Sequence, residues 1–307
     1  MPSGPRLILL VPVSLLALFG ALLVAGVVRS DIGWDAAGAA PVGGTAGVPN
    51  GVRQGGPIID ATADKPRSFS LPDRTVLLTF DDGPDPRWTP RILAELRRER
   101  VPAVFFVVGS AAARHPELLR QIHGSGSELG VHTFTHPDLG HIPGWRTQLE
   151  LSETQLVLAG SAGVTSSLLR PPYSSSPDSI DRSAWSVISD TGERGYLTML
   201  SERDSQDWRR PGVNKIVANA TPPDDRGAIL LLHDAGGDRS QTVAALGPLI
   251  RNLKARGFRF LSGSQAVRAP TVNPPADPDV RWRGLALLWT VRVSDAVLNG
   301  LAVFLTV

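Results

Sequence analysis

The sequence predicts an α/β fold, specifically a reduced or distorted (β/α) barrel of about seven parallel strands between two apolar terminal segments. Short apolar runs alternate with longer helical patterns through the central region, as in proteins with a parallel sheet. This region spans about 190 residues, which is short for a complete eight-unit barrel of ~250 residues. The chain has 307 residues, of which 42% are hydrophobic, and this is enough to bury a sizeable core.

The strands and helices are read from the spacing of apolar residues. Strands are expected at Thr75–Phe80, Ala103–Val108, Glu128–Val131, Ser167–Leu169, Tyr196–Leu200, Ala228–Leu232 and Phe258–Leu261. Helices are expected at Thr89–Arg100, Ala111–His123, Trp145–Ala159 and Gln241–Arg256. In the last helix, Val243, Leu246, Leu249, Ile250 and Leu253 share one face, as a helix packed on a core requires.

Charge and cysteine content exclude several functional classes. The formal net charge is +2 and no basic run contains interleaved aromatic residues, so a nucleic-acid partner is not expected. The absence of cysteine excludes disulfides, thiolate metal ligands and a cysteine nucleophile. Any metal ion must therefore be bound by histidine and carboxylate side chains.

The N-terminal region predicts a membrane anchor and a tether. Leu7–Val28 is a run of 22 residues without a charge, long enough to cross a bilayer. A cleaved signal peptide is the alternative, but its apolar region is ordinarily shorter, so an uncleaved anchor at 1–29 is favoured. Residues 30–73 are then expected to form a tether, because the stretch Ser30–Pro57 is rich in Gly, Ala and Pro.

The C-terminal region predicts a linker and a second apolar helix. A Pro-rich linker is expected at 269–281, after a catalytic domain at 74–268. Residues 282–307 are expected to form a membrane-spanning or an interfacial helix, with spanning slightly favoured for Leu285–Val307. The apolar run continues to the last residue, which suggests a fragment of a longer protein.

The stretch "VLLTFDDGPDP" places two adjacent carboxylates, Asp81 and Asp82, at the end of the first strand. Asp, Gly and Pro commonly form turns, so a turn alone would explain this stretch if it stood by itself. Other polar clusters follow later strands, however, and the C-terminal strand ends of an α/β fold share one rim. These later clusters are His132 and His136, Arg170, Asp204 and Asp207, and His233 and Asp234.

This rim predicts a metal-dependent hydrolase. His132 and His136 lie four residues apart and are expected to face the same way on a helical turn that Pro137 helps to end. Two imidazoles and one carboxylate would give a zinc-like ion three protein ligands and leave a position for water. The second Asp would then accept a proton from this water, an Arg would orient that base, and His233 would act as a general acid.

Five ordered stretches, "TFDDGP", "HTFTHP", "RPPY", "DSQDW" and "LLLHD", resemble the signature motifs of the NodB-type polysaccharide deacetylases, carbohydrate esterase family four. The resemblance covers about Arg74 to Ala266. It implies a distorted (β/α) barrel that removes N-acetyl groups from amino-sugar polymers such as peptidoglycan or chitin. It also implies one divalent metal ion, with zinc favoured and cobalt or another divalent ion as alternatives.

The resemblance assigns a role to individual residues. It implies that Asp81 is the catalytic base, that Asp82, His132 and His136 bind the metal, and that His233 is the acid. It further implies that Arg170 orients Asp81, that Asp207 rather than Asp204 tunes His233, and that Tyr173 offers its backbone N–H to the oxyanion. Leu231 and Trp208 would form the pocket for the acetyl methyl group. Ser174 departs from the family pattern, which often has Gly there, and this departure affects the rim loop rather than a catalytic group.

The sequence therefore predicts a membrane-anchored N-deacetylase whose catalytic domain lies outside the cytoplasm. The flanking helices also resemble those of larger membrane proteins in which such a domain precedes a glycosyltransferase, a region that is absent from this chain. Two alternatives stay open. One is a non-catalytic glycan-binding or scaffolding domain, and the other is an O-acetyl esterase acting on xylan-type polymers.

Overall fold

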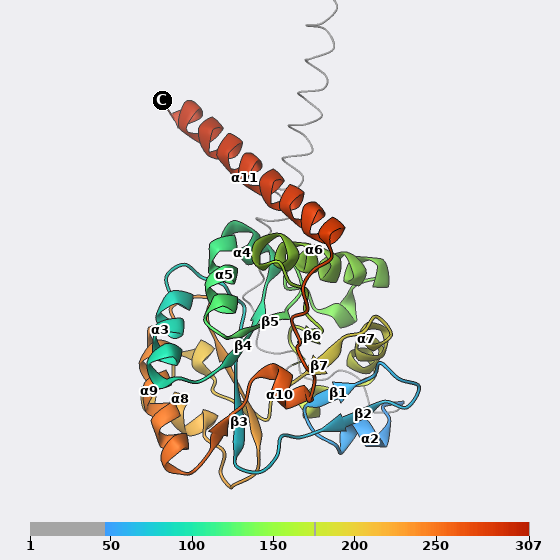
Figure 1. The fold of residues 1–307 in the computed structure, drawn as a ribbon, viewed down its shortest axis with the longest axis vertical. Helices are drawn as coiled ribbons and strands as arrows, with labels where there is room; N and C mark the ends of the chain where they lie inside the picture. Colours follow the sequence, from blue (N-terminus) through green and yellow to red (C-terminus); the bar gives the residue numbers. More distant parts are fainter. Residues whose placement is uncertain (1–46, 175, 307) are drawn as a thin grey trace, which may run out of the picture.

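The computed structural model describes residues 47–174 and 176–306, and its centre is a curled, half-barrel sheet of ten strands (Figure 1). The strands follow the order β2-β1-β7-β6-β5-β4-β3-β9-β8, and β10 also pairs with β3. They are β1 Ile58–Asp60, β2 Arg67–Phe69, β3 Thr75–Asp81, β4 Ala103–Val107, β5 Glu128–Val131, β6 Leu168–Leu169, β7 Leu197–Met199, β8 Arg203–Asp204, β9 Ala228–His233 and β10 Arg259–Phe260. Every pairing from β7 through to β8 is parallel, whereas β1 pairs antiparallel with both β2 and β7.

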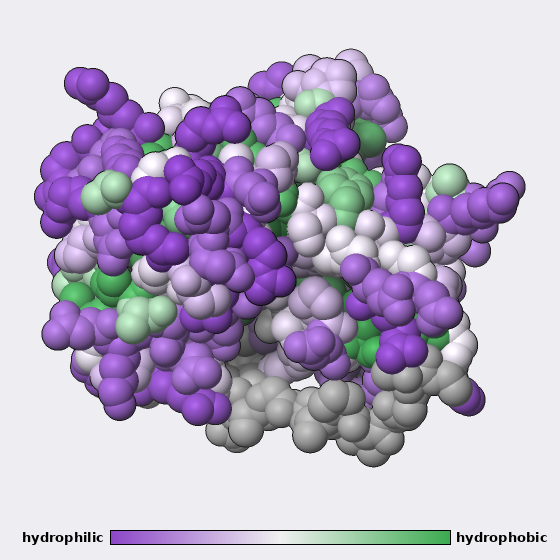
Figure 2. Space-filling view, turned by 90° about the horizontal axis from the view of Figure 1, so that it is seen from below, coloured by the Kyte–Doolittle hydropathy of each residue, from purple (hydrophilic) through white to green (hydrophobic). Residues whose placement is uncertain are grey.

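Helices lie mainly on the outer side of the sheet (Figure 1). They are α2 Asn50–Arg53, α3 Thr89–Glu99, α4 Gly109–Arg114, α5 Pro116–Gly124, α6 Gly144–Ala162, α7 Arg182–Gly192, α8 Val213–Ala220, α9 Ser240–Ala255, α10 Gly263–Val267 and α11 Pro278–Thr306. Short 3-10 turns lie at Leu139–His141, Pro177–Ser179 and Asp207–Arg209. On the face opposite α11, hydrophobic residues form small separate areas within a mainly hydrophilic surface (Figure 2).

Strand β3 shows how the sheet separates its two sides. Val76, Leu78 and Phe80 belong to the core cluster that includes apolar residues of α3, α5 and α9. Leu77 belongs instead to a second cluster on the inner side of the sheet, because successive strand residues point to opposite faces. The alternation continues to Asp81, so its carboxylate lies on the inner side at the end of the strand.

All seven expected strands are present and parallel to one another, and no strand end differs by more than one residue. The expected helix Ala111–His123 is in fact two helices, α4 and α5, since His115 adopts an extended φ of −129° immediately before Pro116. A residue before proline is disfavoured in the helical region, and proline fits the first position of a new helix. The short strand β8 and the helices α7 and α8 were not among the expected elements.

The expectation of a tether up to residue 73 needs correction. Strands β1 and β2 lie inside that range, and Ile58 and Ile59 are fully buried. β1 extends the sheet through Ile58↔Met199 and its neighbouring pairs. The folded domain therefore begins well before Arg74.

The expected Pro-rich linker at 269–281 is also part of the folded domain. Val272 and Asn273 are buried, and the Asn273 side chain both accepts from the Leu129 N–H and donates to the Leu129 carbonyl, at 2.8 Å each. A residue pair, Val164 and Pro275, forms an isolated bridge. This stretch thus covers the start of β5 and β6 before the chain enters α11.

Helix α11 packs on α6 instead of standing apart (Figure 1). The backbones of Gly160 and Gly284 are so close that a Cβ on either residue would lie within 2.5 Å of the other helix. No helix in the described part of the chain is both long and apolar enough to cross a bilayer, so the expected membrane span at Leu285–Val307 is not supported. The expected anchor, Leu7–Val28, lies outside the described residues.

Candidate active site

The site is built at the carboxyl ends of β3 and β9, which are neighbouring parallel strands. Their register aligns Asp81 with His233 and Thr79 with Leu231. Residues two apart on a strand share a face, so all four side chains lie on the inner side of the sheet. This alignment brings the predicted base and the predicted acid to one rim although 152 positions separate them in sequence.

Asp81 is held by Arg170 from the end of β6. The Arg170 Nη1 donates to Asp81 Oδ1 at 2.7 Å and to Thr79 Oγ1 at 2.8 Å. Its Nε and Nη2 donate to the carbonyls of Met199 and Leu200, and its guanidinium lies 4.3 Å from the ring of Phe106. Arg170 is fully buried, and burial is the main cause that lowers its pKa. The predicted contact between base and arginine is therefore present.

Asp82, His132 and His136 form the one group in the described residues that could hold a metal ion. Asp82 Oδ1 lies 3.5 Å from His132 Nε2 and 3.2 Å from His136 Nε2. Burial opposes the charge of Asp82, but the neighbouring imidazoles of His132 and His136 and the charge of His233 hold its pKa well below the usual range. The sequence prediction thus named the same three residues that the fold brings together.

The two histidines do not sit on a helical turn, however. Residues 132–136 form an irregular loop after β5, in which Thr133 and His136 have φ values of +67° and +62°. These left-handed conformations turn the chain back on itself and bring both rings toward Asp82, whose own φ is +76°. The rings are 4.9 Å apart, centroid to centroid.

The donor set fits a divalent metal ion. His132 Nδ1 lies 2.6 Å from the Arg170 carbonyl, which can only accept, so Nδ1 carries the proton and Nε2 presents its lone pair to the site. Ligand atoms bound tetrahedrally to zinc are roughly 3.3–3.6 Å apart, close to the two separations measured from Asp82. Both the tautomer and the spacing suit a zinc-like ion.

His233 is paired with Asp207, from the 3-10 turn after β8. Asp207 Oδ1 lies 2.7 Å from His233 Nδ1, while Oδ2 accepts from the His233 N–H and from Thr242 Oγ1. Burial alone would lower the pKa of His233, but the charge and hydrogen bond of Asp207 and the charges of Asp82 and Asp81 raise it to about 9. His233 is therefore protonated near neutral pH. Asp204 bonds the Gln206 N–H instead of the His233 ring.

The three remaining predicted site residues lie at different distances from the metal-binding cluster. They are Tyr173, Leu231 and Trp208. The Tyr173 hydroxyl lies 3.3 Å from His136 Nδ1, and its φ of +62° marks a sharp turn after Pro172. Leu231 is buried on the inner face of β9. Trp208 is half-buried, and its side chain bonds Asp204 and stacks under Arg209.

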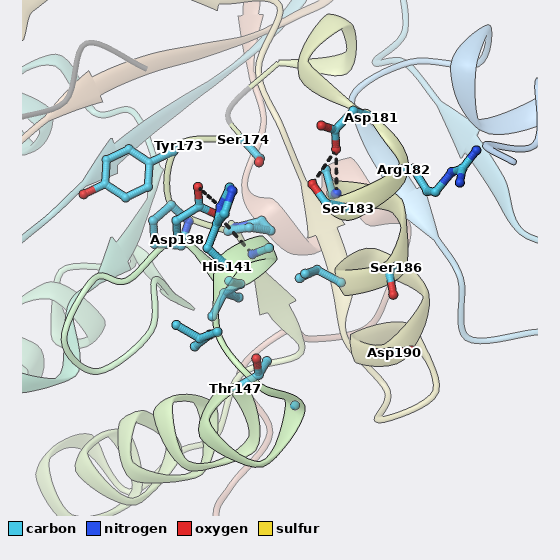
Figure 3. Close-up of a pocket in the computed structure, with 18 of the residues that line it drawn as sticks. Asp138, His141, Thr147, Tyr173, Ser174, Asp181, Arg182, Ser183, Ser186 and Asp190 are labelled. Atoms are coloured by element: carbon cyan, nitrogen blue, oxygen red, sulfur yellow. Dashed lines mark hydrogen bonds and ion pairs between the residues drawn. The ribbon is translucent and has the colours of Figure 1, made fainter. Parts of the chain in front are cut away.

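A cavity of about 700 Å³ opens beside Tyr173 and Ser174 and extends to α7 (Figure 3). Its wall carries hydroxyls such as Ser183 and Ser186, together with charged groups that include Asp190. The size is within the usual range for a small-molecule pocket, ~300–1,000 Å³.

Two residues near the site received no role in the sequence analysis. Thr242, from α9, fixes Asp207 as described above, and no sequence pattern links these two positions. Asp234 follows His233 and lies under the Asp81–Pro84 turn, where a Cβ on Gly83 would come within 2.2 Å of its carboxylate. Burial first, and then the charges of Asp82, Asp81 and Asp85, raise the pKa of Asp234 to about 7.

Known proteins share this arrangement of sequence and fold. The family profile described as polysaccharide deacetylase matches residues 69–194. A peptidoglycan-N-acetylglucosamine deacetylase from Bacillus cereus is 36% identical over 199 residues, which cover 64% of this chain and 89% of the relative. A chitooligosaccharide deacetylase from a Bradyrhizobium species is 38% identical over 201 residues, covering 61% and 88%.

Solved structures are similar over the same region. The crystal structure of the Bc1960 peptidoglycan N-acetylglucosamine deacetylase has a TM-score of 0.59 at 29% identity, covering 66% of this chain and 92% of that one. The Xyl-CE4 domain of a multidomain xylanase from the hindgut metagenome of Trinervitermes trinervoides has a TM-score of 0.56 at 29% identity, covering 67% and 95%.

Proposed function

The chain belongs to the polysaccharide deacetylase family, carbohydrate esterase family four, and from this membership we propose that it hydrolyses N-acetyl groups on an extracytoplasmic amino-sugar polymer in a metal-dependent reaction. The observation that carries the proposal is the position of two opposed groups, Asp81 with Arg170 and His233 with Asp207, around the cluster of Asp82, His132 and His136. The names of the relatives support an amide of an amino sugar as the substrate.

Each group has a distinct task in the proposed reaction. A divalent ion at Asp82, His132 and His136 would make a water more acidic and polarise the acetyl carbonyl. Asp81 accepts a proton from the water as the water oxygen attacks the carbonyl carbon, and Arg170 holds that carboxylate in position. The backbone N–H of Tyr173 is assigned to the oxyanion of the tetrahedral intermediate.

His233 completes the reaction as the general acid. As the C–N bond breaks, the protonated imidazole gives a proton to the amine nitrogen, so the products are acetate and a free amino sugar. With a pKa of about 9, the His233 ring stays protonated until the C–N bond breaks and the amine nitrogen accepts the proton. Asp207 holds the ring through Nδ1, which leaves Nε2 as the donating atom. Leu231 and Trp208 are assigned to the wall around the acetyl methyl group.

The cavity beside Tyr173 supports a polymeric substrate. It begins at the residue assigned to the oxyanion and extends to α7, so a sugar attached to the reacting unit has space beside the site (Figure 3). Hydroxyl and charged groups line it together with Pro171, Pro172 and Val187. Such mixed walls suit the hydroxyls and the apolar C–H faces of a sugar ring.

An extracytoplasmic location is part of the same proposal. It is supported by the length of the uncharged run Leu7–Val28 and by the cell-wall polymer in the names of two relatives. Protease added to intact cells or spheroplasts should digest the central domain if it faces outward. Digestion only after membrane lysis would contradict this placement, and a mature N-terminus after Val28 would indicate a cleaved signal.

Acetate release tests the activity directly. The purified protein, with zinc or cobalt added, should release acetate from N-acetylglucosamine oligomers or peptidoglycan, and a chelator should abolish the release. Acetylated xylan serves as the ester control, since a xylanase domain is among the structural neighbours. Acetate from xylan alone would indicate an esterase, and glycan binding without any release would indicate a scaffolding domain.

A further inference from the structure

The loop that carries both histidines needs support from outside itself. Between His132 and His136 the chain is irregular, and two non-glycine residues, Thr133 and His136, adopt left-handed φ values. Such conformations persist only where the surrounding structure holds them. Contacts from other elements must therefore help to fix the separation of the two imidazoles.

Helix α4 holds one side of this loop. The N–H groups of Gly109 and Ser110, at the start of α4, donate at 2.9 Å to the carbonyls of Thr133 and Phe134. These hydrogen bonds involve only carbonyl groups of the loop. The N–H groups of Phe134 and Thr135 point the other way, toward α6.

The carboxylate of Glu150 accepts hydrogen bonds from the side of the loop that faces α6. Its Oε2 accepts from the N–H of Phe134 at 2.9 Å and from the N–H of Thr135 at 2.7 Å, and its Oε1 accepts from Thr135 Oγ1 at 2.7 Å. Glu150 lies in the second turn of α6 and is only 5% exposed. A carboxylate suits this position because it offers two acceptor oxygens and no donor.

We propose that Glu150 is a positioning residue that holds the loop of residues 133–135 so that the Nε2 atoms of His132 and His136 both face Asp82. The inference rests on the proposed metal site, to which Glu150 contributes no atom. Mutation of residues that orient metal ligands without binding the metal commonly lowers metal affinity by ~10–100-fold. Glu150 thus sets the affinity for the ion without contacting it.

Three substitutions separate this role from general stability. Glu150→Ala removes all three contacts. Glu150→Gln keeps an oxygen for the two N–H groups and an NH₂ that can donate to Thr135 Oγ1, so it should restore the loop. Glu153→Ala, on the same helix, is the matched control, because Glu153 makes none of the three contacts.

The experiment measures the affinity of the metal-free, full-length protein for Co²⁺ by a titration followed by visible absorption, with no substrate present. Glu150→Ala should weaken Co²⁺ binding at least ~10-fold, whereas Glu150→Gln and Glu153→Ala should stay close to the parent. Equal affinity in Glu150→Ala and the parent, or an equal loss in Glu153→Ala, would overturn the proposal. A parent protein that fails to bind Co²⁺ would instead contradict the metal site itself.

Thr135→Val keeps the proposal falsifiable if Glu150→Ala does not fold. It removes only the hydroxyl contact with Oε1 and leaves both backbone bonds in place. A smaller but measurable loss of Co²⁺ affinity is expected. Unchanged affinity in this variant would overturn the role assigned to Glu150.

Discussion

Asp81 and Arg170 form a buried ion pair, with Oδ1 and Nη1 2.7 Å apart and side-chain exposures of 4% and 0%. The backbone carbonyl of Arg170 also accepts a hydrogen bond from His132 Nδ1. One residue at the end of β6 therefore orients both the proposed base and a proposed metal ligand.

Substitution of the two neighbouring carboxylates should separate their roles. Asp81→Asn should retain nearly stoichiometric metal but lose ~10²–10⁴-fold in kcat, since general-base catalysis is commonly worth this much. Asp82→Ala should lose metal, because it removes a ligand. Metal content by mass spectrometry and acetate release check both. Loss of metal in Asp81→Asn and its retention in Asp82→Ala would reverse the assignment.

Replacement of Arg170 by lysine should lower both activity and stability although the charge is kept. Lysine cannot reproduce the planar fork that serves Asp81, Thr79 and the carbonyls of Met199 and Leu200. Carbonyls left unpaired in the core commonly cost about 1–3 kcal/mol each. Chemical denaturation and kcat measurement check this, and a fully active, equally stable variant would show that the fork is dispensable.

The pH profile should depend on Asp207. Because His233 must be protonated to donate, activity should fall as the pH rises toward its pKa of about 9, and a cation beside Asp82 would move this limb below 9. Asp207→Asn removes the main charge that raises this pKa, so the limb should move to lower pH. Asp204→Asn, which does not alter the bond to the ring, is the control. An unmoved limb in Asp207→Asn would exclude His233 as the titrating acid.

Asp234 should make stability depend on pH in a predictable direction. Its pKa is about 7 in the fold against 3.8 for an ordinary Asp, so the folded state binds the proton more tightly. The resulting stabilisation is present below about pH 4 and is lost as the pH rises through 7. Asp234→Asn should flatten the decline in Tm between pH 4 and 8. An identical decline in the parent and the variant would contradict this.

A chain that begins at Arg74 should be strongly destabilised. It lacks β1, in which Ile58 and Ile59 are fully buried, and burial of two such side chains is worth about 3–6 kcal/mol. A typical domain has only ~5–15 kcal/mol of stability. A chain that begins at Gly47 is the control and should unfold cooperatively. Equal thermal stability of the two chains would indicate that β1 does not stabilise the domain.

The sequence alone determined the long strands, the parallel sheet and the polar residues that follow the strand ends. Strand β3 and strand β9 are continuous apolar runs followed by charged residues, and such local patterns are visible without a structure. Because the carboxyl ends of parallel strands share one rim, the sequence placed Asp81 and His233 on the same rim, whereas the pairing of β3 with β9 made them neighbours.

Tertiary structure alone decided how the site is held. The histidine loop is irregular, and its shape depends on hydrogen bonds from α4 and α6 that no local pattern encodes. The same holds for β1, whose three residues, Ile58–Asp60, become a strand through pairing with β2 and with β7, where Ile59 pairs with Thr198, 139 positions later. Short segments carry too little periodicity to specify a conformation, so their structure comes from the partners that the fold supplies.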